Sequence, residues 1–251
     1  SHLPWMRGSL TAKTGVRMVW ADGSEQDIYS PNSDELWQWM TGLIVKYAQI
    51  STEIPSLFGV FLDYENYASG SSGGNCYGLS YDLKILEMFA RAKGIELPEL
   101  ALEARYPWLK EKGLHDQFEA FQIGHWRERC RALREAVDAV NPRFQFCVYP
   151  APGTLLMTEA IWPEWATEKA PLILADACTY GRPTGLMPHE QALQANRDAL
   201  TANLETARKS GLPIIYMGGI DPVVDGADPE FSGKNALMCA DATDGYWIFY
   251  E

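Results

Sequence analysis

Short apolar runs alternate along the chain with longer stretches in which apolar side chains recur at helical spacing. The runs are rich in branched or aromatic residues and have Gly or Pro close by, a pattern typical of buried β-strands. They lie at residues 16–20, 57–63, 144–149, 172–177, 213–217 and 246–250. The helical stretches cover residues 35–49, 81–93, 116–140 and 189–210.

Capping residues support these helices. Ser33 or Asp34 precedes the first helix and Ser80 can cap the second, while Gly94 and Gly211 follow the ends of two helices. Continuous apolar strands that alternate with amphipathic helices indicate a parallel sheet. We therefore predict an α/β fold of the (β/α)8 TIM-barrel type, built as one domain over residues 1–251. The Pro-interrupted stretch at 94–115 is interpreted as a helical insertion.

The number of strands is low for a closed barrel. The 251 residues match the size of a barrel of about 250 residues, but six runs are found where eight are needed. If the run at 57–63 is the fourth strand, the run at 16–20 is the third. We therefore expect either a missing N-terminal segment or an incomplete barrel closed by a partner subunit, with self-association through the open sheet edges.

Composition narrows the choice of ligand. Acidic residues outnumber basic ones by 33 to 21, which gives a formal charge of −12 and disfavours nucleic acid and anionic membrane surfaces as partners. No apolar run approaches the ~18 residues that a membrane-spanning helix needs. Nine Trp and twelve Tyr favour a neutral saccharide, because flat aromatic rings bind sugars.

Sequence motifs for metals and nucleotides are missing. The five cysteines show no C-x-x-C or Cys/His spacing, so neither a zinc site nor a disulfide framework is predicted. No Walker loop or dinucleotide fingerprint occurs. The expected site therefore uses no metal and no cofactor.

Carboxylates stand at the end of the second apolar run, where parallel α/β folds bind their ligands. Asp63 and Glu65 are two residues apart, so on a strand both project from the same face, and Tyr64 points the other way toward the helices. Mutual repulsion between two acids favours one protonated and one ionised group, as glycosidic cleavage requires. The alternative is a structural pair that caps a helix or binds a loop lysine.

Residues 58–65 resemble the strand-four signature of the chitinase-like (family 18) glycoside hydrolases, Asp-x-x-Asp-x-Asp-x-Glu. Aligned without gaps, Asp63 falls on the last Asp and Glu65 on the Glu, while Phe58 and Phe61 replace the two earlier acids. The resemblance implies that Glu65 is the general acid. It also implies that Asp63 assists attack by the N-acetyl group of the substrate.

Other polar and aromatic residues near strand ends complete the expected site. Asp176 is the first candidate for a second catalytic carboxylate, ahead of Asp221 and Glu251, although it is equally well explained as a cap on its loop. Four aromatic residues are expected to stack on sugar rings: Tyr149, Tyr180, Tyr216 and Trp247, with Glu251 beside them.

These features predict a glycoside hydrolase that acts on a neutral or N-acetylated oligo- or polysaccharide. A non-catalytic carbohydrate-binding protein on a degenerate barrel is the alternative, favoured by the loss of two acidic positions from the motif. A barrel lyase or aldolase is a weaker alternative, because no strand-end Lys or His ligand cluster is found.

Overall fold

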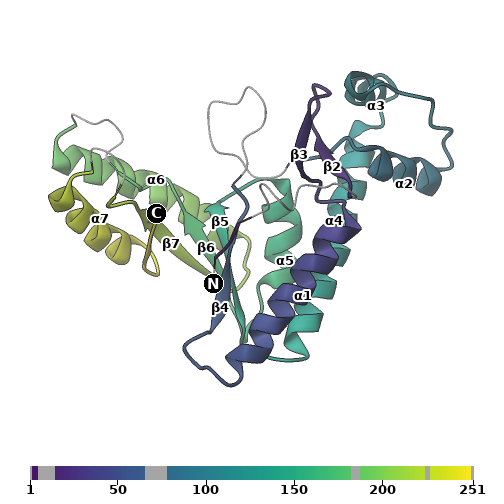
Figure 1. Ribbon diagram of the computed structural model, residues 1–251. Helices are drawn as coiled ribbons and strands as arrows, with labels where there is room; N and C mark the ends of the chain where they lie inside the picture. Colours follow the sequence, from purple (N-terminus) through teal and green to yellow (C-terminus); the bar gives the residue numbers. More distant parts are fainter. Residues whose placement is uncertain (1, 5–14, 66–77, 182–186, 224–226, 250–251) are drawn as a thin grey trace.

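A computed structural model describes residues 2–4, 15–65, 78–181, 187–223 and 227–249 of the chain (Figure 1). Within these residues, six parallel strands form one sheet in the order β1-β4-β5-β6-β7-β8. The strands are β1 (His2–Pro4), β4 (Gly59–Asp63), β5 (Gln145–Ala151), β6 (Leu172–Asp176), β7 (Ile214–Ile220) and β8 (Tyr246–Ile248).

The sheet corrects the prediction of a (β/α)8 barrel. In the described part of the chain β1 pairs only with β4, and β8 pairs only with β7, so the sheet is open at both edges. The run at 16–20 is not a barrel strand. It contains β2 (Arg17–Val19), which pairs antiparallel with β3 (Glu25–Tyr29) in a separate two-stranded sheet. Gly23, with φ of 84°, allows the tight turn between β2 and β3, and β1 takes the place beside β4.

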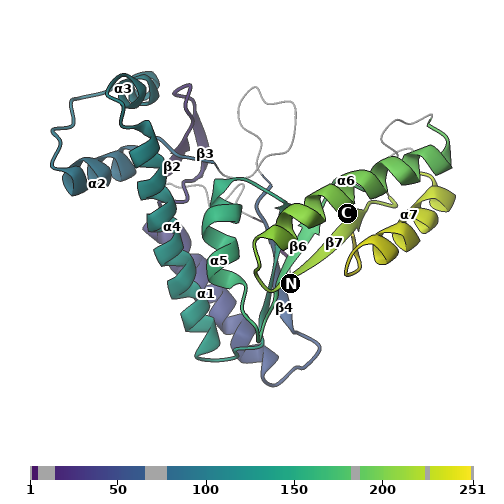
Figure 2. The ribbon, with the colours of Figure 1, turned by 180° about the vertical axis from the view of Figure 1, so that it is seen from behind.

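Helices cover one face of the sheet (Figures 1 and 2). Helices α1, α4 and α5 lie beside β4 and β5, whereas α6 and α7 lie beside β7. The helices of the described residues, including those outside this layer, are α1 (Asp34–Ser51), α2 (Leu83–Lys93), η1 (Leu102–Ala104), α3 (Arg105–Glu111), α4 (His115–Asp138), η2 (Leu156–Ile161), α5 (Trp162–Trp165), α6 (His189–Lys209) and α7 (Pro229–Ala242). No helix among the described residues combines the length and apolarity needed to cross a bilayer.

The helix ends follow the local sequence with one exception. The Ser33 side chain caps α1, and Gly94 ends α2 in the left-handed conformation, as the sequence predicts. The cap of α2 is Asp82 instead of Ser80, because the Asp82 carboxylate accepts the Ile85 backbone N–H at 3.0 Å. A shorter helix results, starting two residues later than predicted.

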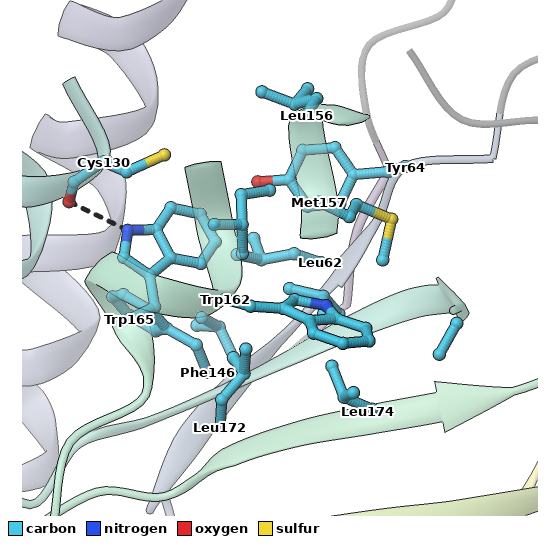
Figure 3. Packing of buried hydrophobic residues seen from close by; sticks show 14 of the residues in the cluster. Leu62, Tyr64, Cys130, Phe146, Leu156, Met157, Trp162, Trp165, Leu172 and Leu174 are labelled. Carbon is cyan, nitrogen blue, oxygen red and sulfur yellow. Dashed lines mark hydrogen bonds between the residues drawn. The ribbon is translucent and has the colours of Figure 1, made fainter. Parts of the chain in front are cut away.

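The main core lies between the sheet and the helices, and alternate strand residues fill it (Figure 3). Tyr64 is fully buried there beside Trp165, with ring centroids 6.5 Å apart, as its alternation with Asp63 predicts. Trp165 also contacts the Phe146 ring at 4.7 Å and donates from Nε1 to the Cys130 carbonyl at 2.9 Å. These large side chains fix β4 and β5 against the helices.

A second, smaller core forms around α2, α3 and the start of α4, next to the β2–β3 hairpin. It holds Phe89 and Phe118, which meet edge to face at 5.4 Å. The predicted insertion at 94–115 supplies η1 and α3 to this region. A buried polar network joins it to the rest of the molecule, because Asp82 also accepts hydrogen bonds from Ser30 and Asn32.

The opposite, inner face of the sheet carries half-buried side chains. Phe61, Cys147, Ile173 and Met217 project there and line a cavity of about 240 Å³. Their half-buried state contrasts with the full burial of the residues between them. The sequence predicts that the candidate site lies on this inner face, at the carboxyl ends of the strands.

Candidate functional site

Asp63 and Glu65 stand together at the carboxyl end of β4. The β4–β5 register pairs Asp63 with Tyr149, which places both on the inner face of the sheet. The Asp63 Oδ1 atom accepts the Glu65 backbone N–H at 2.7 Å, so the two residues form a tight turn directly after the strand. The Tyr149 hydroxyl lies 3.5 Å from Glu65 Oε1 and donates toward it.

Four aromatic rings gather beside these carboxylates, and we call them the aromatic cluster: Phe61, Tyr149, Tyr180 and Trp247. Tyr149 stacks with Phe61 at 5.9 Å and with Tyr180 at 6.3 Å between ring centroids. Trp247 meets Tyr149 edge to face at 5.1 Å. Trp247 also lies 5.3 Å from Phe61 and 5.5 Å from Tyr180. Four strands or the turns after them thus contribute to one aromatic cluster next to two acids. Tyr149 is buried within it, with 3% of its surface exposed, whereas Phe61, Tyr180 and Trp247 are half-buried.

Gly219 makes the close packing of this cluster possible. It lies opposite Trp247 in the β7–β8 register. A Cβ atom on Gly219 would come within 2.6 Å of the Tyr180 ring and 3.0 Å of the Trp247 ring. The absence of a side chain at this position therefore lets both rings approach the strand.

The Tyr180 hydroxyl is held in its protonated form. Burial is the main cause that raises the pKa of Tyr180 far above 10, and the adjacent Tyr149 hydroxyl adds to it. The negative charges of Glu65 and Asp63 also raise this pKa, so the phenol lies within electrostatic range of both carboxylates. Two tyrosine hydroxyls and two acids are accordingly brought together.

The expectation that Asp176 shares this rim is wrong. Asp176 follows the alternation of Leu172 and Leu174, which point toward the helices, and only 1% of its surface is exposed. Its Oδ2 atom accepts from the Tyr216 hydroxyl at 2.5 Å and from Asn203 Nδ2 of α6 at 2.9 Å. A carboxylate in that position faces away from Glu65.

Tyr216 must also be removed from the predicted sugar-binding set. Its side chain is fully buried on the helix-facing side of β7, as the alternation from Ile214 requires. Burial, followed by the charge of Asp176, raises its pKa well above the ordinary tyrosine range. It remains a neutral donor to Asp176 inside the core.

The remaining candidates have different outcomes. Asp221 directly follows β7, where its backbone N–H donates to the Tyr180 carbonyl at 3.3 Å and its Oδ1 accepts from Val223 N at 3.2 Å. It therefore borders the turn that carries Tyr180. Glu251 lies outside the described residues.

Phe61 is the member of the site that the sequence analysis missed. It stands two residues before Asp63, so the same alternation that joins Asp63 to Glu65 also places Phe61 on the inner face. The chitinase-like signature carries an acid at this position. The Phe61 ring instead contributes to the aromatic cluster.

The site thus combines acid groups, hydroxyl donors and flat apolar rings. Among the described residues, no group of three or more His, Cys, Asp or Glu side chains is arranged to hold a metal ion. No protein-family model matches the chain, and a search of curated proteins finds no match.

Proposed function

We propose that the protein is a glycoside hydrolase with Glu65 as the general acid/base. The observation that carries the proposal is the position of the Asp63–Glu65 pair beside the aromatic cluster, at the carboxyl edge of a parallel sheet. Ligands of open α/β sheets bind at this edge. Aromatic rings next to carboxylates suit a sugar, whose C–H faces pack on rings while its hydroxyls bond to acids.

In this proposal Glu65 protonates the leaving glycosidic oxygen and afterwards accepts a proton from the attacking water. Asp63 has two tasks. Its Oδ1 fixes the backbone of Glu65 through the 2.7 Å hydrogen bond, and its negative charge stabilises the cationic sugar centre. The hydroxyl of Tyr149 donates toward Glu65 Oε1 and steadies the orientation of that carboxyl group.

The resemblance to the chitinase-like signature extends the proposal to the substrate. In that signature the acid at the Asp63 position assists attack by the N-acetyl oxygen of the substrate. With Asp176 directed into the core, a nucleophile supplied by the substrate fits the residues at the rim. An N-acetylated saccharide is therefore the preferred substrate class in the proposal.

A non-catalytic saccharide-binding protein is the second candidate, and one observation favours it. Phe61 occupies an acidic position of the signature and packs against Tyr149 and Trp247, so an apolar surface replaces part of the expected carboxylate set. Such a surface retains the ability to bind a sugar without the groups that cleave it.

Hydrolysis of defined oligosaccharides separates the two candidates. Release of reducing ends from chitooligosaccharides and neutral oligosaccharides is measured for the wild type, Glu65→Gln and the control Glu87→Gln, an exposed residue of α2. General acid catalysis contributes about 10²- to 10⁴-fold, so Glu65→Gln should lose at least about a hundredfold in kcat while Glu87→Gln keeps full activity. Full activity of Glu65→Gln would overturn the assignment, and binding without released sugar would favour the second candidate.

A further inference from the structure

The turn after β6 is held by a buried carboxylate. Asp176 Oδ1 accepts the backbone N–H of Cys178 at 2.6 Å, and Oδ2 accepts from Tyr216 and Asn203. The Asp176 carboxylate therefore receives three hydrogen bonds: one from a hydroxyl, one from a side-chain amide and one from the backbone of its own turn. With 1% of its surface exposed, this residue has no direct access to a ligand.

The backbone of the same turn reaches the aromatic cluster. The Asp176 carbonyl accepts from Trp247 Nε1 at 3.0 Å. The Thr179 hydroxyl donates to the Gly219 carbonyl at 2.8 Å, and Tyr180 follows immediately in the chain. One buried residue is thus connected through its side chain to the core and through its main chain to Trp247 and Tyr180.

We propose that Asp176 is a positioning residue of the saccharide site: it fixes the turn at 176–180 so that Trp247 and Tyr180 lie beside Asp63 and Glu65. The proposal rests on the proposed function for the identity of the ligand, but the placement of the two rings is independent of turnover. Asp176 itself touches neither substrate nor reacting atoms.

The chemistry of the three donors explains why an acid is used. An ionised carboxylate only accepts hydrogen bonds, whereas an Asn in its place would present an NH2 group to at least one of the donors. A buried acid is costly unless it is fully hydrogen-bonded, and a Leu would continue the apolar alternation of β6 at lower cost. The presence of an acid at position 176 is therefore explained by its hydrogen bond to the turn at 176–180, and not by packing of the core.

Asp82 offers a closely matched control. It is also buried, with 2% exposure, and its carboxylate accepts from the Ser30 hydroxyl at 2.8 Å, the Asn32 amide at 2.9 Å and the Ile85 backbone N–H at 3.0 Å. It lies at the start of α2 and belongs to the smaller core region, not to the aromatic cluster. Asp176→Asn and Asp82→Asn thus each replace one of two accepting carboxylate oxygens by an NH2 group, in equivalent sets of hydrogen bonds in different places.

The test uses the full chain labelled with 5-fluorotryptophan, in which the Trp247 ¹⁹F resonance is assigned by Trp247→Phe. Asp176→Asn should shift this resonance and raise the Kd for chitotriose by roughly tenfold, which corresponds to about 1.4 kcal/mol. Asp82→Asn should change neither, although both variants lose stability to urea. If Asp176→Asn does not fold, Asn203→Ala, which removes one of the three donors, should shift the Trp247 resonance away from its wild-type position.

An unchanged Trp247 resonance in Asp176→Asn, or an equal change in Asp82→Asn, would overturn the positioning role. Failure of the proposed function is recognised separately, because the wild type would then bind neither chitotriose nor cellotriose. The resonance comparison decides the role of Asp176 in that case as well.

Discussion

Gly219→Ala should disrupt the aromatic cluster, because the new methyl group would project from β7 into the Tyr180 and Trp247 rings. The added methyl group would lie 2.4 Å from the Asp176 carbonyl oxygen and 2.6 Å from the Tyr180 ring. Ordinary van der Waals contact begins near 3.4 Å, so β7 and the turn after β6 must separate by about 1 Å. Overpacking of this kind costs about 1–3 kcal/mol, and the shift also moves the Trp247 ring, 3.0 Å from the new atom.

Urea denaturation followed by far-ultraviolet circular dichroism measures the free energy of unfolding of Gly219→Ala. Gly124→Ala is the control, since Gly124 lies within α4 and a Cβ there meets no atom within 4 Å outside its own helix. The control should gain up to about 1 kcal/mol from the higher helix propensity of Ala. A free energy of unfolding for Gly219→Ala within about 0.5 kcal/mol of the wild type would refute the reasoning, since that is the range of neutral surface changes.

Two further predictions concern the helical layer. Burial, together with nearby cations, lowers the pKa of His125 from 6.5 to about 4. As the pH drops from 6.5 to 4, His125 takes up its proton in the unfolded chain but not in the folded chain, so the free energy of unfolding should fall. The urea midpoint of His125→Gln should therefore depend less on pH across that window than the midpoint of the wild type. Buried Arg134 donates to the Phe144 carbonyl at 2.9 Å and lies 4.6 Å from the Phe146 ring centroid. Arg134→Met should therefore lower the free energy of unfolding by about 2 kcal/mol in urea titrations, whereas exposed Arg91→Met should leave it unchanged.

Local patterns predict five of the six strands of the parallel sheet, but neither β1 nor the open edges of the sheet. The runs at 57–63, 144–149, 172–177, 213–217 and 246–250 each overlap a strand of the parallel sheet, because buried parallel strands carry continuous apolar residues. The run at 16–20 has the same composition and is in a hairpin, since pairing is decided by the turn at Gly23 and by residues distant in sequence. Strand β3, Glu25–Tyr29, was missed because charged residues interrupt it.

The alternation of side chains was the reliable guide to the site. It placed Asp63 and Glu65 on one face and Tyr64 in the core, and the structure has Asp63 and Tyr64 in those positions. The same rule, applied to Leu174 and Asp176, would have placed Asp176 among the helices. The prediction for Asp176 rests on its proximity to a strand end, which does not distinguish the two faces of a sheet. Self-association through the open edges stays a prediction.

The most direct test of the central claim is a structure of the Glu65→Gln variant with a bound chitooligosaccharide. We predict a sugar ring packed against the aromatic cluster, with a glycosidic oxygen about 2.6–3.2 Å from the Gln side chain at position 65. A saccharide bound elsewhere on the molecule, with no glycosidic oxygen within reach of residue 65, would contradict it.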